Sequence, residues 1–212
     1  MRGKFITFEG PEGCGKSTHS KALAERLRAR GIETILTREP GGTPLAEKIR
    51  ALVREETGDA PVASAETLLF LAARAQNVAR AVLPALERGA WVLCDRFADS
   101  TFAYQGFGRG FDLAELERLN AFATGGLAPD LTILLDVPPE ISRERLGTRQ
   151  NATGEKADRM ENAGRLFHKA VRDGFLALAA LPENAGRFAV IDSSGGMDRV
   201  SAAIDAAVER LI

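Results

Sequence analysis

The chain of 212 residues is 45% apolar and 27% charged, which is the composition of a globular protein with a sizeable core. Its formal net charge of −1 excludes a general basic surface for nucleic acid or an anionic membrane. Glu9 comes too early for the apolar segment of a signal peptide, and no apolar run has the length of a membrane span. Two cysteines are too few for a disulfide framework, so we expect a protein of the reducing cytoplasm with no membrane or nucleic-acid partner.

Short apolar runs alternate with longer helical patterns along the chain, as in folds that build a parallel sheet. We predict strands at Phe5–Phe8, Ile32–Thr37, Trp91–Cys94, Leu131–Leu135 and Phe188–Ile191. We predict helices at Ser17–Arg30, Pro44–Arg54, Ala65–Val82, Leu113–Ala123, Glu140–Leu146, Met160–Leu181 and Arg199–Ile212. Pro84 is expected to disturb the long helix before it. This order predicts one domain, residues 1–212, with a three-layer αβα fold around a five-stranded parallel sheet.

The polar segments of most interest directly follow the predicted strands. They are Gly10–Ser17, Arg38–Thr43, Asp95–Gln105 and Asp136. Because the carboxyl ends of parallel strands meet at one edge of a sheet, we expect these segments to form one site. The polar stretch Gly147–Lys156 lies between two predicted helices and is the best candidate for a mobile flap. His19 and His168 are interpreted as exposed helix residues.

A complete phosphate-binding motif follows the first predicted strand. The pattern G-x-x-x-x-G-K-[ST] is matched by Gly10-Pro11-Glu12-Gly13-Cys14-Gly15-Lys16-Ser17, with Thr18 next. Its glycines allow backbone N–H groups to point at phosphate oxygens, and the following helix adds its positive end. Lys16 brings a charge to the β- and γ-phosphates, and the Ser17 hydroxyl can ligate Mg²⁺. The motif predicts a P-loop NTPase that binds a nucleoside triphosphate such as ATP with Mg²⁺.

Two arginines at strand ends indicate a second phosphate-bearing substrate. Asp95 and Arg96 directly follow the third predicted strand, and Arg38 follows the second. Asp95 can help to hold Mg²⁺, and Arg96 can clamp a phosphate group bidentately. No Asn-Lys-x-Asp segment is present, which disfavours a GTPase. Cations on both sides of a transferred phosphoryl group are what a nucleoside monophosphate kinase needs.

Several stretches of the chain together resemble the thymidylate kinase family. They are Phe8-Glu9-Gly10 with the P-loop, Thr37–Thr43, Leu69–Arg74, Asp95–Ser100, Ala103–Gly106, Pro129–Thr132, Leu135–Val137 and Asp158–Glu161. Arg-Glu-Pro-Gly-Gly and Asp-Arg-aromatic are specific to the family when they occur together. The resemblance implies that the enzyme phosphorylates dTMP to dTDP with ATP and Mg²⁺. It also implies a homodimer. The largely apolar circumference of Ala65–Val82 fits a helix buried on two sides, either in a dimer or under a third helix layer within the monomer.

Other functions remain open at this point. Another deoxynucleotide or a nucleoside could be the acceptor of the same reaction. A nucleotide-binding regulator without turnover is disfavoured by the presence of four residues suited to catalysis, Lys16, Ser17, Asp95 and Arg96. A nucleic-acid-binding ATPase is disfavoured by the net charge and by the absence of a basic stripe.

The resemblance implies a pocket for the thymine base on the third predicted helix and beyond the third strand. Phe70 would stack on the ring, and Arg74 would hydrogen-bond its edge. These two residues are four apart on a predicted helix, so they share one face. An aromatic face suits a flat base, with a contribution of about 1–3 kcal/mol per stack. Ser100 and Gln105 would complete the pocket.

The resemblance also implies roles around the sugar and the phosphates. Arg38 and Arg96 would hold the monophosphate. Tyr104 would lie against the deoxyribose where a 2′-hydroxyl would otherwise fit, which is discrimination by steric exclusion. Glu12 would reach the 3′-hydroxyl from the P-loop. We expect the adenine to be held by backbone contacts around Asp192–Gly196.

A lid over the donor phosphates is expected at about residues 143–159, to exclude water from the transfer. Because the P-loop carries Gly13 and no arginine after Glu12, the resemblance indicates the type in which the lid supplies the catalytic arginine. Arg149 is the first choice, with Arg145, Lys156 and Arg159 as alternatives. We therefore predict a catalytic set of Lys16, Arg96, Arg149 and Glu12. It would act by positioning and charge neutralisation, without a covalent intermediate.

Overall fold

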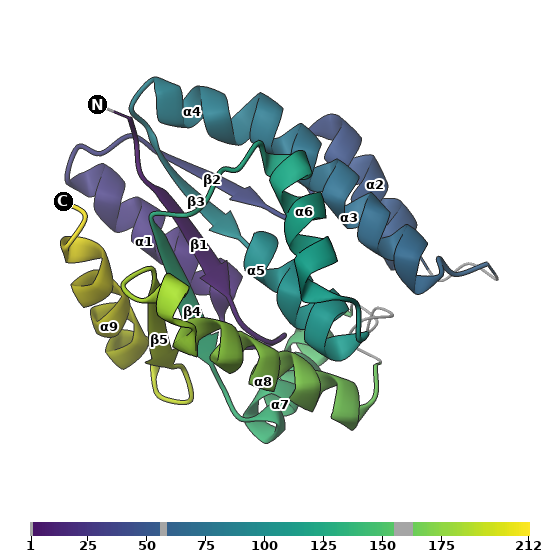
Figure 1. Ribbon diagram of the computed structural model, residues 1–212. Helices are drawn as coiled ribbons and strands as arrows, with labels where there is room; N and C mark the ends of the chain where they lie inside the picture. The colour runs from purple at the N-terminus through teal and green to yellow at the C-terminus, as the bar shows by residue number, and fades with distance from the viewer. Residues whose placement is uncertain (1, 56–58, 155–162) are drawn as a thin grey trace.

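The computed structural model describes residues 2–55, 59–154 and 163–212, and it has a parallel sheet between two layers of helices (Figure 1). The strands are β1 Phe5–Glu9, β2 Thr34–Arg38, β3 Trp91–Asp95, β4 Leu131–Asp136 and β5 Phe188–Asp192. All are parallel, in the order β2-β3-β1-β4-β5. This is the predicted three-layer fold of a P-loop NTPase. Arg38, Asp95 and Asp136 each prove to be the last residue of a strand.

The helices lie between the strands in the predicted order, with several shorter elements among them. The α-helices are α1 Lys16–Ala29, α2 Pro44–Arg54, α3 Ala63–Asn77, α4 Leu83–Glu87, α5 Ala98–Thr101, α6 Leu113–Thr124, α7 Pro139–Thr153, α8 Arg165–Ala180 and α9 Met197–Glu209. The π-helices η1 Val78–Val82 and η2 Phe102–Gly108 and the 3₁₀ turn η3 Pro182–Asn184 complete the set.

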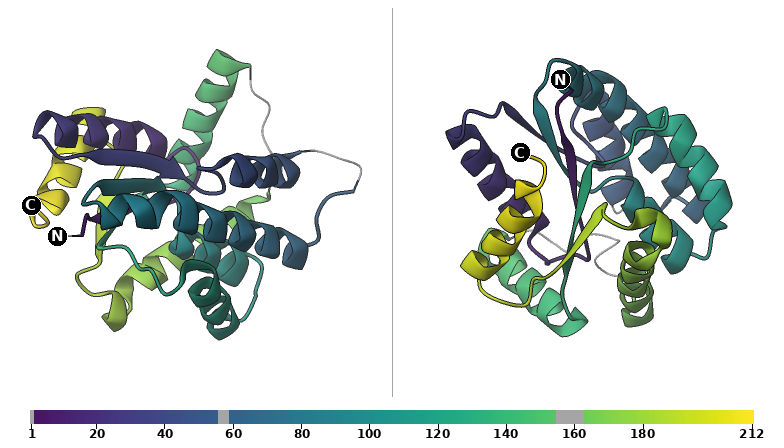
Figure 2. Two further views of the ribbon diagram at one scale, coloured as in Figure 1. Left: turned by 90° about the horizontal axis from the view of Figure 1, so that it is seen from above. Right: turned by 60° about the vertical axis from the view of Figure 1, so that its left-hand side comes forward.

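Side-chain alternation along the strands divides the core between the two faces of the sheet. On β1, Ile6 and Phe8 pack with α1 and α9, whereas Phe5 packs with η1 and α4 on the opposite face. Helix α8 covers the second face beside η2 (Figure 2). Because the side-chain period of a strand is two, Glu9 projects to the same face as Phe5 and Thr7. That face carries the turn from β3 into α5.

Local signals in the sequence fix the ends of two helices. Thr43 caps α2 by accepting the N–H of Ala46 at 3.3 Å, and Pro44 occupies the first helical turn. Asp112 caps α6 by accepting the N–H of Glu115 at 2.8 Å, and the helix ends in the left-handed Gly125. These caps place the helices at the boundaries that the sequence pattern predicts.

The long helix around Pro84 is widened rather than broken. Helix α3 continues through the π-helical turn η1 into α4, which contains Pro84. Proline lacks an N–H group and clashes with the carbonyl four residues earlier, so a widened turn ahead of it relieves the conflict. Val78 and Val82 of this turn are buried against the sheet. The predicted disturbance is therefore present, but the helix extends to Glu87.

Two segments differ from the sequence prediction. The stretch 98–108 was given no helix, yet it forms α5 and η2, which pack on α8. The predicted helix end at Leu146 is wrong, because α7 continues to Thr153 and projects from the body of the molecule (Figure 2, left). Residues 155 and 156 of the predicted flap, and residues 155–159 of the predicted lid, lie outside the described residues. None of the described helices has the length and apolarity needed to cross a membrane.

Two helical glycines offer a test of this packing. A Cβ atom on Gly174 of α8 would lie 2.6 Å from Cγ of Phe107, whereas a Cβ on Gly147 of α7 would meet nothing within 4 Å. Gly174→Ala should therefore lower the free energy of unfolding by about 1–2 kcal/mol. Gly147→Ala should raise it by about 0.5–1 kcal/mol through helix propensity. Urea denaturation measures both, and a stabilising effect at position 174 would contradict the described packing of α8 on η2.

Candidate active site at the carboxyl ends of the strands

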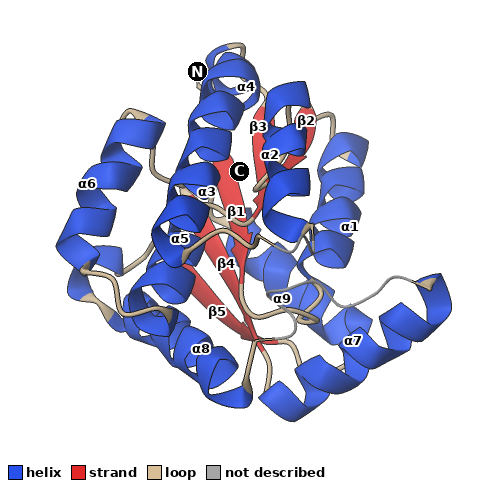
Figure 3. Cartoon of the chain, turned by 90° about the vertical axis from the view of Figure 1, so that its right-hand side faces the viewer, coloured by secondary structure: helices blue, strands red, loops and turns tan. Residues whose placement is uncertain are grey.

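A cleft of about 930 Å³ opens at the edge where the strands end. Its volume is that of a typical ligand site. Figure 3 shows the strands of the sheet between the helices. Of the seventeen predicted site residues with described side chains, fourteen line the cleft: Glu12, Gly13, Gly15, Lys16, Ser17, Thr18, Arg38, Phe70, Arg74, Asp95, Arg96, Ser100, Tyr104 and Gln105. The other three, Gly10, Pro11 and Cys14, are not among the lining residues.

The P-loop forms a cradle whose lysine is folded onto its own backbone. Gly13 has φ 70°, and a Cβ atom there would lie 2.6 Å from the carbonyl oxygen of Ser142, so only glycine fits. The Lys16 ammonium donates to the carbonyl oxygens of Gly10 at 3.1 Å and Pro11 at 2.8 Å. Lys16 is only 8% exposed. A cation is thus stored inside the loop, within reach of an anion that enters the cradle.

Two oxygen ligands suited to a divalent cation meet beside the cradle. The Ser17 hydroxyl, in the first turn of α1, donates to the carboxylate of Asp95 at the end of β3. Hydroxyl and carboxylate oxygens are the hard ligands that Mg²⁺ prefers. Within residues 2–55, 59–154 and 163–212, no group of three or more His, Cys, Asp or Glu side chains could hold a metal ion. A Mg²⁺ ion here would therefore depend on phosphate and water oxygens as well.

Arg96 joins the P-loop to the opposite wall of the cleft. Its guanidinium donates to Gly10 O at 3.2 Å, Ser100 Oγ at 3.1 Å, Glu12 Oε1 at 2.8 Å and Tyr104 Oη at 3.0 Å. The Tyr104 hydroxyl donates to the other Glu12 oxygen at 2.6 Å. Burial alone would raise the pKa of Glu12, but the charges of Arg96 and Lys16 outweigh it and lower the pKa. Glu12 is therefore ionised and holds both partners.

Arg74 is buried in the wall of the cleft with nearly all its hydrogen bonds made. It donates to Glu39 Oε2 at 2.6 Å, Thr101 Oγ1 at 2.7 Å, Asn120 Oδ1 at 2.5 Å and Phe97 O at 2.9 Å. These contacts use four of the five N–H groups of the guanidinium. Both side chains of the Arg74–Glu39 ion pair are 4% exposed. The pair fixes the position of Arg74 before any ligand arrives.

Phe70 and Gln105 present an apolar face and an unused donor to the same cleft. Phe70 is partly buried, one helical turn before Arg74 on α3. Gln105 is 2% exposed, and its Nε2 atom has no hydrogen-bond partner among the described residues. A buried donor without a partner is rare in native proteins and needs an explanation. At the wall of a cleft, a ligand oxygen supplies one.

Arg38 lies at the end of β2 and is held by the loop that follows. It pairs with Glu47 at 2.9 Å, and Glu47 also accepts the N–H of Gly42 at 2.9 Å. Gly42 has φ 84°, and a Cβ atom there would lie 2.2 Å from Thr37 Oγ1 and 2.4 Å from Asn77 Oδ1. The second glycine of the Arg-Glu-Pro-Gly-Gly segment is therefore required by close packing.

The donor end of the cleft contains one of the predicted lid residues. Arg145 lines the cleft, and its Nη2 donates to Ser194 O at 3.4 Å. The Arg149 side chain and the residues Lys156 and Arg159 lie outside the described part of the chain. The loop after β5 contributes Ser193, Gly195 and Gly196 to the lining, in the region predicted for the adenine.

Both histidine predictions are wrong. His19 is only 5% exposed and lines the cleft, with Nδ1 at 3.4 Å from Ser201 Oγ. Its position four residues before Leu23 places it on the buried face of α1, a signal that the sequence already carried. His168 is partly buried, with its ring centroid 5.7 Å from that of Phe167.

Sequence reasoning assigned no role to two buried carboxyl groups that meet the site residues. Glu39 pairs with Arg74, and burial raises its pKa in spite of that charge. Glu9 is 0% exposed and accepts the N–H of Phe97 at 2.7 Å and the hydroxyl of Ser100 at 2.6 Å. Glu39 lies in the Arg-Glu-Pro-Gly-Gly segment, and Glu9 lies in the Phe8-Glu9-Gly10 stretch. A charged residue at the end of an otherwise apolar strand is the signal that could have found Glu9.

Comparison with known proteins gives matches over nearly the whole chain. A family model described as thymidylate kinase matches residues 8–204. A thymidylate kinase of Geobacter sp. (strain M21) is 50% identical over 210 residues, which cover 98% of this chain and 92% of the relative. One from Pseudomonas fluorescens (strain Pf-5) is 48% identical over 212 residues, covering 100% of this chain and 98% of the relative. One from Geotalea uraniireducens is 50% identical over 207 residues, covering 97% and 96%.

The buried ion pair can be tested by its effect on stability. Glu39→Gln leaves the Arg74 guanidinium buried without a counter-charge and should lower the free energy of unfolding by about 3 kcal/mol. The double variant Glu39→Gln with Arg74→Met should lose less free energy of unfolding than the sum of the losses of the two single variants. Urea denaturation of the wild type, both single variants and the double variant measures this. Glu33→Gln, which breaks the exposed pair with Arg88, should change stability by at most about 0.5 kcal/mol. Additive losses at Glu39 and Arg74 would contradict the coupling.

Proposed function

The chain belongs to the thymidylate kinase family, and we propose that it transfers the γ-phosphoryl group of ATP directly to dTMP in the cleft described above. The observation that supports this most is the pairing of two anion sites in one cleft. The P-loop with Lys16 forms one, and Arg96 with Arg38 forms the other. Glu12 and Arg96 join the two sites at 2.8 Å.

On the donor side, we propose that the backbone N–H groups of Gly10–Thr18 and the Lys16 ammonium bind the β- and γ-phosphates. Lys16 would exchange its two carbonyl contacts for phosphate oxygens. The adenine would lie near Ser193–Met197, and Arg149 remains our choice for the lid contact with the phosphates. Arg145 is the alternative, supported by its place in the cleft wall.

We propose that Mg²⁺ is held by the Ser17 hydroxyl and the Asp95 carboxylate together with phosphate oxygens. The fit rests on the direct contact of these two groups beside the cradle. When bound, the ion neutralises charge on the phosphate oxygens and helps to orient them. Asp95 would release the Ser17 hydroxyl so that both groups turn toward the cation.

On the acceptor side, the proposed roles follow the chemistry of each wall. Phe70 would stack on thymine, and Gln105 would donate its unpaired N–H to a carbonyl oxygen of the base. Arg74, with one N–H left, and Ser100 would complete the edge of the pocket. We propose that Tyr104 and Glu12, joined at 2.6 Å, face the sugar.

The monophosphate would be held by Arg38 and Arg96. Its attacking oxygen is already ionised near neutral pH, so no general base is required. Lys16 and Arg96 would compensate the negative charge from opposite sides while the phosphoryl group is in transit. Because these cations are preplaced by their protein contacts, little reorganisation is needed at the moment of transfer.

We further propose a homodimer of cytoplasmic location. Exposed apolar side chains lie on neighbouring helices, with Leu68 of α3 58% exposed and Phe122 of α6 91% exposed. The free thiols of Cys14 and Cys94 are consistent with a reducing compartment. Light scattering of the wild type and of Phe122→Glu measures the assembly, and a wild-type monomer at micromolar concentration would contradict the dimer.

The substrate assignment is tested by ADP release with ATP, Mg²⁺ and each deoxynucleoside monophosphate in turn. A strong preference for dTMP is expected. Turnover with a different monophosphate would retain the phosphotransferase and discard the proposed base pocket. No turnover with any monophosphate would favour a nucleotide-binding regulator.

Lys16→Ala should reduce kcat by about a thousandfold or more, because the variant loses the cation nearest the transferred group. Its fold and its affinity for dTMP should be retained, as measured by thermal unfolding and calorimetry. Lys21→Ala removes an exposed lysine of the same helix and serves as the matched control. Full activity of Lys16→Ala would refute the proposed donor site.

Gln105→Leu should separate stability from function. Since Nε2 has no hydrogen-bond partner among the described residues, the free energy of unfolding should stay unchanged or rise. The KM for dTMP should rise by about three- to tenfold, the loss of one hydrogen bond, while the KM for ATP is unaffected. Initial-rate kinetics and urea denaturation provide the two readouts. An unchanged KM for dTMP would remove Gln105 from the base pocket.

A further inference from the structure

Glu9 is a fully buried carboxyl group at the floor of the site that the proposed mechanism does not use. It ends β1 and directly precedes the P-loop glycine, Gly10. Its side chain projects from the same face of the sheet as that of Phe5, toward the turn between β3 and α5. A buried ionisable group needs partners to offset its desolvation, so its contacts are informative.

Both Glu9 oxygens bind the residues that follow Arg96. Oε1 accepts the Phe97 N–H at 2.7 Å, and Oε2 lies 2.6 Å from the Ser100 hydroxyl. Phe97 is the N-cap residue of α5, and its side chain makes no capping hydrogen bond. Glu9, on strand β1, therefore supplies a hydrogen-bond acceptor at the amino end of α5. The first N–H groups of a helix have no partner within the helix itself.

The turn that Glu9 binds is strained at Arg96. Arg96 has φ 72°, and it is the only residue other than glycine with a positive φ in the described chain. For a residue with a Cβ atom, this conformation costs about 1–2 kcal/mol. It persists only where surrounding contacts require it. The Phe97 N–H bond restrains the backbone directly after the strained residue.

Ser100 extends the restraint to the guanidinium itself. Its hydroxyl oxygen contacts Glu9 at 2.6 Å and accepts Arg96 Nη1 at 3.1 Å. A single carboxyl group thus fixes both the backbone after Arg96 and a hydroxyl that its side chain binds. No hydrogen bond joins Glu9 to Arg96 directly among the described contacts, so the restraint by hydrogen bonding reaches the guanidinium through the turn.

We propose that Glu9 is a positioning residue for Arg96, holding its guanidinium on the acceptor side of the cleft through Phe97 and Ser100. The proposal rests on the proposed role of Arg96 in binding the acceptor phosphate. Loss of these contacts leaves the donor cradle intact and lets Arg96 relax from its strained backbone. Loss of the Glu9 contacts should therefore impair the use of the acceptor and leave the binding of the donor unchanged.

The charge state of Glu9 decides which replacement mimics it. Burial and the nearby Asp99 raise the pKa of Glu9 to about 8, with Ser100, Arg96 and the Phe97 N–H opposing them. The carboxyl group therefore holds a proton at pH 7. A glutamine amide keeps its length, one acceptor oxygen and one donor group, and is close to the neutral acid. Methionine keeps the length and removes the oxygen atoms.

The test compares Glu9→Gln and Glu9→Met by initial-rate kinetics with dTMP and by calorimetric ATP affinity at pH 7. For Glu9→Met we expect kcat/KM for dTMP to fall by at least about twentyfold and the Kd for ATP to stay within about twofold. Glu9→Gln should restore kcat/KM to within about threefold of the wild type. Glu9→Ala replaces the methionine variant if that protein does not fold.

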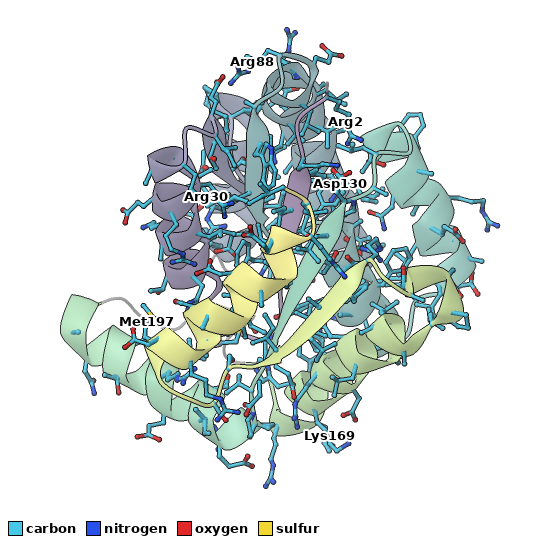
Figure 4. All side chains as sticks on the ribbon, turned by 90° about the vertical axis from the view of Figure 1, so that its left-hand side faces the viewer. Arg2, Arg30, Arg88, Asp130, Lys169 and Met197 are labelled. Carbon is cyan, nitrogen blue, oxygen red and sulfur yellow. The ribbon has the colours of Figure 1, made fainter. Side chains whose placement is uncertain are left out.

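Asp130→Ala is the matched control. Asp130 accepts the N–H of Phe5 at 2.7 Å, at the opposite end of β1 and away from the cleft (Figure 4). It should lose stability without a change in kcat/KM for dTMP. Equal losses for dTMP and ATP in Glu9→Met, an unaltered kcat/KM, or a glutamine variant as impaired as methionine would each overturn the proposal. A wild type inactive with dTMP would instead overturn the proposed function.

Discussion

The arrangement of the site depends on the hydrogen bonds of the Arg96 guanidinium. Its partners come from the P-loop, from α5 and from η2, so one side chain joins segments that are far apart in sequence. The backbone conformation behind it is unfavourable for arginine and is retained by contacts on both sides. The position of this guanidinium is therefore set jointly by the P-loop and by the turn that follows β3.

The cations of the cleft are stored against protein oxygens. Lys16 rests on two carbonyl groups, Arg38 on Glu47 and Arg96 on Glu12. For Lys16 and Arg96, which are largely buried, the charge is thereby offset before a substrate arrives, at a cost lower than that of unpaired ions, whereas the Arg38–Glu47 pair is exposed. Phosphate groups can then replace these contacts one for one, which suits a reaction that needs cations in place and water excluded.

Sequence patterns fail here where tertiary contacts decide the local structure. The stretch 98–108 is rich in small and aromatic residues with no amphipathic period, and its helices form against α8. Pro84 was expected to disturb its helix, but the compensating π-turn depends on burial of Val78 and Val82 against the sheet. His19 was predicted to be exposed because histidine is polar, although its spacing from Leu23 places it on the buried face of α1.

The sequence by itself determined the strand order along the chain, the P-loop and the set of residues that gather at the strand ends. Those features follow from local periodicity and from motifs whose chemistry is tied to their spacing. Only the tertiary structure decided that Glu39 and Asn120 bind Arg74, and that Glu9 binds the turn that follows Arg96. Such pairings join residues between 35 and 91 positions apart, and no local pattern records which buried donor meets which acceptor.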